Sequence, residues 1–504
     1  MCMSASEGRG PKPKRPRAAR AAGAVVACLF AGGCAVGPNF TPPGPPKLDR
    51  YSAQPGATRL EGDDAAQTVE LGRPTDPVWW RLFGSPALDD LVAAGLKASP
   101  TLASARQALQ QSQDQARAGA GVFFPSLGGA FAATRERTAP LEIGDKGPGS
   151  TFSLYTLSGD INYAVDLFGG ERRNVEALNA AADQQRYAVG AAYLLLTGGI
   201  VEAAVARAGY ADEADTLADI VRLDTDQRDI LDAEYKAGAA AWSAVLGAEE
   251  QLAADRQSLA AVRQQQAAAT TLLNELIGRE PAEDAPPPPA LGDLTVPADA
   301  PVSLPSQLVR QRPDILQAEA ALHQASAQVG VATAALFPSI SITGDYGQAS
   351  NALARLGSPA GLFWGVSPTV DVPIFRGGAL WSNRRAAQAA YRKAQADYRQ
   401  TVLAALKQVA DQLKALGADA EISAANRSAF DAASLDHALA GANRQAGVIA
   451  DYDVMTLEIQ TDRTRLGLIA AKSQRLQDVV ALYLACGGGW SGHAQDSGLA
   501  AVAQ

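Results

Sequence analysis

The stretch LPSQLVRQRPDILQAEAALHQASAQVGVATAALFPSISITG, residues 304–344, contains a change of hydrophobic period that decides the fold. From Pro313 onward the pattern is that of a helix, and after Phe337-Pro338-Ser339 the period becomes two, as in a strand with one apolar and one polar face. The apolar positions are Ile340, Ile342 and Tyr346. The polar positions between them are Ser339, Ser341, Thr343 and Asp345. The stretch therefore predicts a helix followed directly by a strand.

The first half of the chain contains the same parts in the same order. Phe124-Pro125-Ser126 lies 213 residues before Phe337-Pro338-Ser339, and Ser99-Pro100 precedes Arg312-Pro313 by the same offset. Further along the offset is 209, and the matching pairs are Gly238 with Gly447, Val245 with Val454, Glu249 with Glu458, and Gln251 with Gln460. This collinear order indicates a tandem duplication, with a first repeat over residues 79–280, a linker over 281–311, a second repeat over 312–490 and a tail over 491–504.

Each half is predicted to hold two strands. In the first half one alternation starts at Leu127 and a second runs to Val165 with a slip of one position at Gly159, and in the second half a further strand surrounds Trp364 and Val370. An apolar face opposite a face of Ser, Thr, Asp and Asn is typical of a channel barrel in a membrane. The alternation alone fits a soluble β-sandwich with one wet face equally well.

Four strands are too few to close a membrane-spanning barrel, for which about eight is the minimum. An open sheet edge cannot lie in lipid, because its backbone groups would have no hydrogen-bond partners. If the strands are inserted in a membrane, the chain must oligomerise, and three copies would supply a closed barrel of twelve strands.

Long helices are predicted in the two stretches without proline. All 29 prolines lie in residues 1–148 or 281–373, and heptad seams run through the rest, for example Val402, Leu406, Val409, Leu413 and Leu416. Each stretch has one interruption, at Lys236-Ala237-Gly238 and at Gln445-Ala446-Gly447, which we interpret as the tip of a helical hairpin. The span from Gly170 to Gly238 corresponds to roughly 100 Å of helix, a length suited to a duct across the periplasm.

The N-terminus has the features of a bacterial lipoprotein signal over residues 1–33. A basic segment precedes the apolar run Ala21 to Phe30, and the small residues Ala31-Gly32-Gly33 precede Cys34, the predicted lipidation site. Residues 34–78 are expected to form a lipid-anchored, Pro-rich tether. Removing residues 1–33, with six basic residues and one acidic residue, changes the net charge from −9 to −14, which argues against nucleic acid as a partner.

No catalytic site, metal site or cofactor is predicted. The three histidines, His323, His437 and His493, lie far apart, and none has metal-ligand spacing. Phe168-Gly169-Gly170 and the segment Phe375 to Gly378 are expected to be strand-to-helix corners. Trp79-Trp80 are expected to be packing residues, and Arg310 and Arg312 are expected to make polar contacts at a helix start. A lipid-anchored hydrolase would need a cluster of titratable residues, and the sequence shows none. A periplasmic coiled-coil scaffold remains an alternative.

At the level of motifs the chain resembles the TolC-like outer-membrane efflux factors, and within them the NodT-like lipoprotein subgroup of resistance-nodulation-division multidrug efflux systems. The resemblance covers about residues 30–490, and residues 304–344 carry it most specifically. The other segments are GCAVGPNFTPP (33–43), WWRLFGSPALDDLV (79–92), YAVDLFGGERR (163–173), VPIFRGGAL (372–380) and QAGVIADYDV to LYLACGGGW (445–490).

The resemblance implies a mainly α fold with a β-barrel portion. Long antiparallel helices would form a trimeric periplasmic α-barrel, and four strands per chain would build a twelve-stranded membrane β-barrel. It implies a homotrimer in the outer membrane, with a periplasmic adaptor, an inner-membrane pump and outer-membrane lipid as partners. The implied function is a passive exit duct for multidrug efflux and not an enzyme, with an ABC-type exporter or type I secretion system as the alternative setting.

The resemblance also assigns roles to the two hairpin tips. Ala237 and Gly238 at the first tip, and Gly447 and Val448 at the second, are expected to contact the adaptor. Asp453, six residues after Gly447, matches the acidic ring that closes the family's inner end, and Asp451 is a possible addition. The family's second acidic position is Thr456 here, and the equivalent position of the first half is Ala244. The alternative is that both aspartates only cap a helix, which would move the gate to Ile449, Tyr452 or Arg444.

Overall fold

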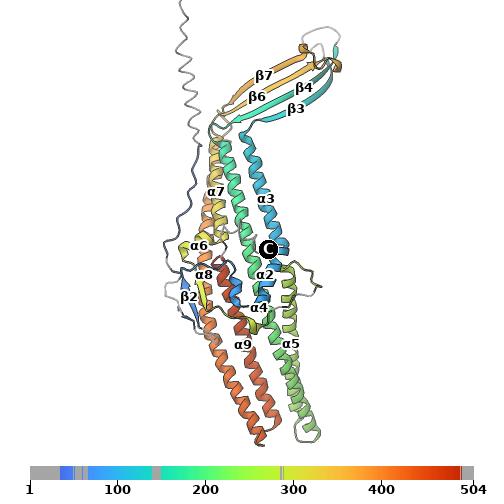
Figure 1. The fold of residues 1–504 in the computed structure, drawn as a ribbon, viewed down its shortest axis with the longest axis vertical. Coiled ribbons are helices and arrows are strands. Elements are labelled where there is room, and N and C mark those ends of the chain that lie inside the picture. The colour runs from blue at the N-terminus through green and yellow to red at the C-terminus, as the bar shows by residue number, and fades with distance from the viewer. Residues whose placement is uncertain are drawn as a thin grey trace, which may run out of the picture. The chain divides into compact units, whose positions relative to one another are not determined.

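The computed structural model describes residues 35–48, 50–51, 59–60, 66–138, 149–283, 286–287, 289–488 and 490. Residues 1–33, Cys34 and the tail 491–504 lie outside the described residues. The chain divides into two compact units. Unit 1 comprises Met1–Thr41, Gln113–Ala181 and Leu322–Ala394, and unit 2 comprises Pro42–Ser112, Ala182–Ala321 and Gln395–Gln504. Helices α3, α4, α7 and α8, which are labelled in Figure 1, each contribute residues to both units.

Unit 1 is built around an antiparallel sheet of four strands. Its order is β3 (Ser126–Thr138), β4 (Ser150–Val165), β6 (Ser339–Ser350) and β7 (Leu362–Asp371). Two 3₁₀ turns, η5 (Leu353–Arg355) and η6 (Pro359–Gly361), connect β6 to β7. The strands predicted from the alternation are therefore present, and each half of the chain contributes one hairpin.

The predicted slip at Gly159 is wrong. The pairing of β4 passes through Gly159 without interruption, since Gly159 lies opposite Gly129 of β3 and opposite Tyr346 of β6. Ser153 is a polar residue at an apolar-face position near the end of the strand, and its polarity does not require an extra residue in the register.

Each strand pair leads into a long helix through a glycine corner. Gly169, with φ of 78°, directly precedes α4 (Gly170–Lys236), and Gly377 and Gly378, with φ of 59° and 78°, precede α8 (Ala379–Gln445). Glycine adopts these left-handed angles without the Cβ clash that other residues suffer. Asp166 accepts hydrogen bonds from the first-turn amides of Glu171 and Arg172 at 3.2 and 2.9 Å. Both predicted corners are confirmed.

The other helices adjoining the sheet of unit 1 are shorter. Helix α3 (Pro100–Ala120) reaches β3 through the 3₁₀ turn η2 (Gly121–Phe123), and α7 (Pro313–Ala334) precedes β6. Helix α3 is preceded by α2 (Pro86–Ala98), and the two helices are separated at Ser99. The break follows from Pro100, whose ring disfavours a helical conformation for the residue before it.

Two helical hairpins extend through unit 2. In the first hairpin, α4 of 67 residues is followed by α5 (Trp242–Leu276) of 35 residues, and the second repeats both lengths with α8 and α9 (Asp451–Ala485). Apolar side chains hold the hairpins together, including Leu217, Ile220 and Leu223 of α4, Leu259 of α5 and Ile459 of α9. At 1.5 Å per residue the longer helices measure about 100 Å.

The main core of unit 2 surrounds the 3₁₀ helix η1 (Trp79–Phe83). Trp79 is fully buried and its ring lies 5.4 Å from that of Tyr483, so the predicted packing role of Trp79-Trp80 is confirmed. Arg312 is buried and donates hydrogen bonds to Asp314, Gln408 and the carbonyl of Ala485, which confirms its role at the helix start.

A small sheet completes unit 2. Its order is β1 (Arg59–Leu60), β2 (Gln67–Leu71) and β5 (Asp299–Val302), and β2 runs parallel to β5. Helix α6 (Pro305–Gln311) and the 3₁₀ turn η4 (Leu291–Asp293) lie in the predicted linker 281–311. The sequence patterns did not predict this sheet, because its strands are too short to alternate.

Among the described residues one helix, α4, is long and apolar enough to cross a membrane by length and composition. In its most apolar window 61% of the residues are buried within the protein, as in a core helix.

Candidate functional site: the strand face and the hairpin tips

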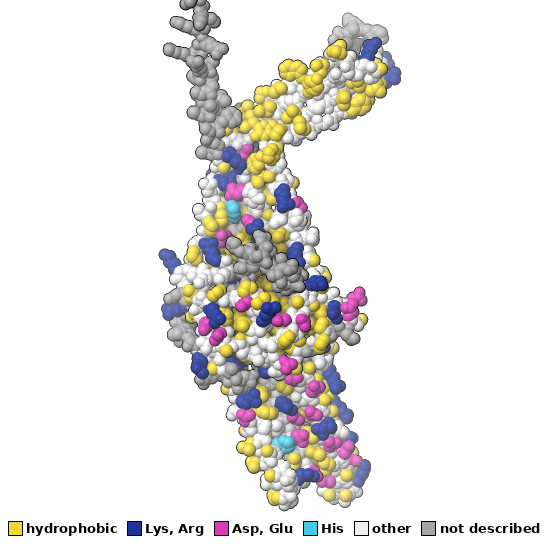
Figure 2. All heavy atoms as spheres, viewed as in Figure 1, with side chains coloured by type: hydrophobic (Ala, Val, Ile, Leu, Met, Phe, Trp, Pro, Cys, Tyr) yellow, Lys and Arg dark blue, Asp and Glu magenta, His cyan; other side chains and the backbone are white. Residues whose placement is uncertain are grey.

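One face of the four-stranded sheet is apolar and exposed. Residues that lie opposite one another across the strands share a face, and Leu127 pairs with Ile161, Phe131 with Leu157, and Tyr346 with Trp364. Leu127 is 78% exposed and Trp364 is 72% exposed, far more than large apolar residues of a core. Figure 2 shows hydrophobic side chains along the sheet. A continuous apolar face of this kind is suited to lipid.

The opposite face of the same sheet is polar. Asp160 of β4 lies directly across from Asp345 of β6, and the next residues outward are Gly128 and Gly365. The neighbouring row holds Ser126, Asn162, Thr343 and Ser367. Two aspartates side by side are unfavourable on a dry face, so this face is suited to water.

The two hairpin tips share one backbone turn. At the first tip Gly238 has φ of 78°, its amide donates to Tyr235 O at 2.9 Å, and the Ala239 amide donates to Glu234 O at 2.8 Å. At the second tip Gly447 has φ of 72°, its amide donates to Arg444 O, and the Val448 amide donates to Asn443 O, both at 2.9 Å. These bonds define the Schellman motif, with glycine in the left-handed position after each helix.

The side chains that close the two tips differ in kind. At the first tip Tyr235 packs against Trp242, with ring centroids 5.1 Å apart. The offset of 209 converts these two positions into Arg444 and Asp451, which form an ion pair at the second tip. The first tip is therefore closed by an aromatic contact and the second by opposite charges.

Asp453 also contributes to the second tip. Its Oδ2 accepts a hydrogen bond from the Ala450 amide at 3.2 Å, so the side chain satisfies a free amide before α9. The capping role considered from the sequence is thus present, and Asp451 lies in the same first turn. Neither contact tests whether the aspartates form a gate, which stays a prediction.

One hydrogen-bonded contact joins the two hairpins close to the tips. The Gln227 amide of α4 donates to Tyr452 O at 3.2 Å and to Thr456 Oγ1 at 2.7 Å, both on α9. Thr456, where the resembled family has its second acid, therefore links the hairpins instead of adding a charge.

In unit 1 the segment that follows Cys34 is held against α4 and α7. The Val36 amide donates to Phe168 O at 3.0 Å, and the buried Arg173 donates to Asn39 Oδ1 at 2.6 Å. Phe40 stacks on His323 at 4.5 Å, and His323 contacts Glu176 at 2.9 Å. Burial by itself would raise the pKa of the Glu176 carboxyl, but its hydrogen bonds with Arg173 and His323 lower it below its usual value.

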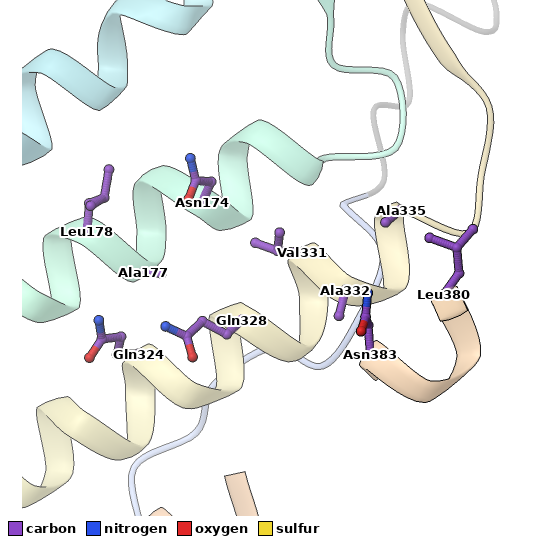
Figure 3. Close-up of a pocket in the computed structure, with 10 residues that line it drawn as sticks. All are labelled: Asn174, Ala177, Leu178, Gln324, Gln328, Val331, Ala332, Ala335, Leu380 and Asn383. Atoms are coloured by element: carbon purple, nitrogen blue, oxygen red, sulfur yellow. The ribbon is translucent and has the colours of Figure 1, made fainter. Parts of the chain in front are cut away.

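The described residues offer no candidate metal site. No group of three or more His, Cys, Asp or Glu that could hold a metal occurs among them. A cavity of about 330 Å³ in unit 1 is lined by the amides of Asn174, Gln324, Gln328 and Asn383 together with apolar side chains, as Figure 3 shows. Neutral amides can hydrogen-bond a passing solute but cannot act as general acids or bases near neutral pH.

The sequence patterns located the tips but missed the contacts that close them. The spacing of seven between Tyr235 and Trp242, and between Arg444 and Asp451, flanks each glycine and was the available signal. Cys34 lies outside the described residues, so its predicted lipidation stays untested.

Comparison with known proteins identifies the family. The family model described as "Outer membrane efflux protein" matches residues 91–279 and 304–488. Nodulation protein T of Rhizobium leguminosarum bv. viciae is 28% identical over 480 residues, which cover 93% of each chain. The probable efflux pump outer membrane protein TtgC of Pseudomonas putida is 27% identical over 482 residues, 92% of this chain and 95% of the relative.

The structural comparison agrees. The solved outer-membrane channel OprN superposes with a TM-score of 0.78 at 26% identity, covering 91% of this chain and all of that one. The predicted resemblance, the mainly α fold with a β portion and the outer-membrane efflux function are confirmed. With a family model that matches well over half of its length, the chain belongs to the outer membrane efflux protein family.

Proposed function

We propose that the chain forms a homotrimeric exit duct through the outer membrane for a tripartite multidrug efflux system. The observation that carries the proposal is the sheet order β3-β4-β6-β7 combined with its apolar exposed face. This order leaves β3 and β7 each with one edge that no strand covers among the described residues. Such edges are excluded from lipid, and three copies joined from β7 to β3 give a closed barrel of twelve strands.

The edge contact can be tested by cross-linking. Cysteines placed at Leu127 on β3 and at Val366 on β7 lie on the apolar face of the two outer strands. We expect a series of such β3–β7 pairs to cross-link between chains to a ladder that ends at three copies, with one strand register favoured. A matched pair within one chain, Leu127 and Ile161, is expected to give no intermolecular product. Absence of β3–β7 products in every register would contradict the barrel.

The anchor proposed at Cys34 places an acylated N-terminus beside the membrane. The contacts of Val36 and Asn39 with the strand-to-helix corner support this placement, because they hold the next residues near the end of the sheet. Mass spectrometry of the mature protein is expected to find a diacylglycerol thioether and an N-acyl chain on Cys34, and Cys34→Ser should remove both. Lipid label retained by Cys34→Ser would place the anchor elsewhere.

The hairpin tips are proposed to dock a periplasmic adaptor, whose partner is an inner-membrane pump. Val448 is 70% exposed at the second tip, and a Cβ built on Gly238 or Gly447 meets nothing within 4 Å. An open glycine turn beside an exposed apolar side chain is suited to close contact with another helical tip. Asp453 and Asp451 are proposed to form an acidic constriction when three chains meet, because like charges around a narrow axis focus a negative potential.

A further inference from the structure

Each helical hairpin of unit 2 contains a pair of aspartates in contact across its two helices. In the first hairpin Asp224 of α4 contacts Asp255 of α5, and in the second Asp419 of α8 contacts Asp478 of α9. Asp224 is 4% exposed and Asp419 is 7% exposed. At the offset of 209 the positions matching Asp224 and Asp255 are Ala433 and Thr464, so the duplication does not explain the similarity.

In the more buried member of each pair, one carboxyl oxygen lacks a donor. Oδ2 of Asp224 and Oδ2 of Asp419 are inaccessible to water, and no described residue hydrogen-bonds either atom. A buried ionised carboxylate without a donor costs several kcal/mol by typical transfer values. Because the group in contact is a second carboxylate, the arrangement is favourable only when one of the two carries a proton.

The other member of each pair accepts hydrogen bonds from side-chain donors. Asp255 accepts hydrogen bonds from Gln251, four residues earlier, at 2.7 Å and from Arg463 of α9 at 3.2 Å. Asp478 likewise accepts a hydrogen bond from Gln474, four residues earlier, at 3.1 Å. Donors of this kind favour the charged form of the carboxyl that they contact, which leaves the proton to Asp224 and Asp419.

We propose that each hairpin binds one proton, shared by Asp224 and Asp255 in the first and by Asp419 and Asp478 in the second, and that this proton fastens the two helices of the hairpin together. Loss of the proton leaves two carboxylates in contact between adjacent helices, which repel each other. Arg463 of α9 donates a hydrogen bond to Asp255, so a change in the protonation of the first pair also alters a contact of the second hairpin.

The charges around the pairs support this assignment. The charged groups facing Asp224 are Asp255 from α5 and Arg463 from α9, and those facing Asp419 are Asp478 and Arg475 from α9. Burial, followed by the hydrogen bond and the charge of the partner carboxylate, raises the pKa of Asp224 and of Asp419 to about 7. A cavity of about 370 Å³ lined by Asp224, Gln251 and Tyr452 offers a route for proton exchange at the first pair.

The direction of the pH effect follows from proton linkage. A folded-state pKa of about 7 against a usual value of 3.8 means that the folded chain holds protons that the unfolded chain releases. Stability should therefore fall as the pH rises from about 4 to about 7, and these groups should add no further change above that range. The pairs lie about 18 Å and about 39 Å from the tip ends of α4 and α8, so neither is part of the tips.

Infrared spectroscopy of the full-length protein in detergent tests the proposal, because a protonated carboxyl has a C=O band distinct from that of carboxylates. We expect the wild-type protein to lose two such groups around pH 7. Asp224→Asn should remove one of them and Asp419→Asn the other. Asp226→Asn, on the same helix with a side chain 48% exposed, should leave the band unchanged.

Asn can donate to the partner carboxylate as the protonated acid does, so both variants are expected to fold and to lose part of the stability decline between pH 4 and 7. The variant Asp255→Asn provides a second test in the same infrared experiment. With a donor amide opposite it, Asp224 should ionise below its wild-type range, and its band should vanish at pH 6. A C=O band that keeps its full amplitude near pH 6 in all three variants would contradict the proposal of a shared proton. Failure of both Asp224→Asn and Asp419→Asn to fold would contradict it as well.

Discussion

The two hairpin tips are equivalent in backbone and different in chemistry. Both end a helix of 67 residues with the same pair of hydrogen bonds around a left-handed glycine. The first is closed by Tyr235 and Trp242, and the second by Arg444 and Asp451 at the equivalent positions. The turn is thus a requirement of the fold, while the side chains that flank it were free to diverge. The tip with charges is the one that also carries Asp453, the candidate gate residue.

The largest expected effect concerns docking of the adaptor at the tips. Val448→Asp places a charge on an exposed side chain without altering the glycine turn, and it should abolish drug resistance while leaving the protein in the outer membrane at the wild-type level. Ala239→Asp at the equivalent place of the first tip should reduce resistance if both tips dock. Minimal inhibitory concentrations, with immunoblots of membrane fractions, measure both. Wild-type resistance in Val448→Asp would move the docking site away from the second tip.

The next effect concerns ion passage and separates the gate from the cap. Asp453→Ala removes both the charge and the hydrogen bond to the Ala450 amide, whereas Asp453→Asn removes only the charge. If Asp453 lines a constriction, both variants should lose cation selectivity and block by divalent cations in planar-bilayer recordings. Asp345→Asn on the strand face should keep that block. Unchanged selectivity in both Asp453 variants would leave it as a cap and turn attention to Ile449, Tyr452 and Arg444.

The smallest effect concerns the side-chain contacts that close the two tips. Tyr235→Ala should destabilise the first tip by about 1 kcal/mol at any salt concentration, since aromatic contacts contribute about 0.5–1.5 kcal/mol. Arg444→Gln should cost between about 0 and 1 kcal/mol at low salt and less in high salt, because the ion pair is exposed. Hydrogen exchange of the tip amides at two salt concentrations distinguishes them. Equal salt dependence at both tips would contradict the assigned difference.

How far the sequence predicts the structure depends on the length of each pattern. The four strands and both hairpins follow from long stretches of period two or of helical period, and Gly238 and Gly447 follow from the helix stop that glycine supplies. The sheet β1-β2-β5 has strands of two to five residues and joins segments more than 200 residues apart, so no local sequence pattern predicts it. The false slip at Gly159 came from treating polarity as a register signal near a strand end.

The site was less predictable than the fold. The pairing of Arg444 with Asp451, and of Asp224 with Asp255, depends on which helix faces meet and on rotamers, which residue spacing alone does not determine. The repeat boundaries, the lipid anchor and the gate stay predictions. The order β3-β4-β6-β7, in contrast, supports the proposal that a closed barrel requires more than one chain.

That requirement is the central claim, and the mass of the detergent-solubilised mature protein tests it most directly. Light scattering corrected for bound detergent is predicted to give three copies of the chain at micromolar concentration. Infrared or circular dichroism spectra of the same sample should retain the β contribution of the strands. A monodisperse single chain with its strands intact would contradict the closed barrel and, with it, the proposed duct.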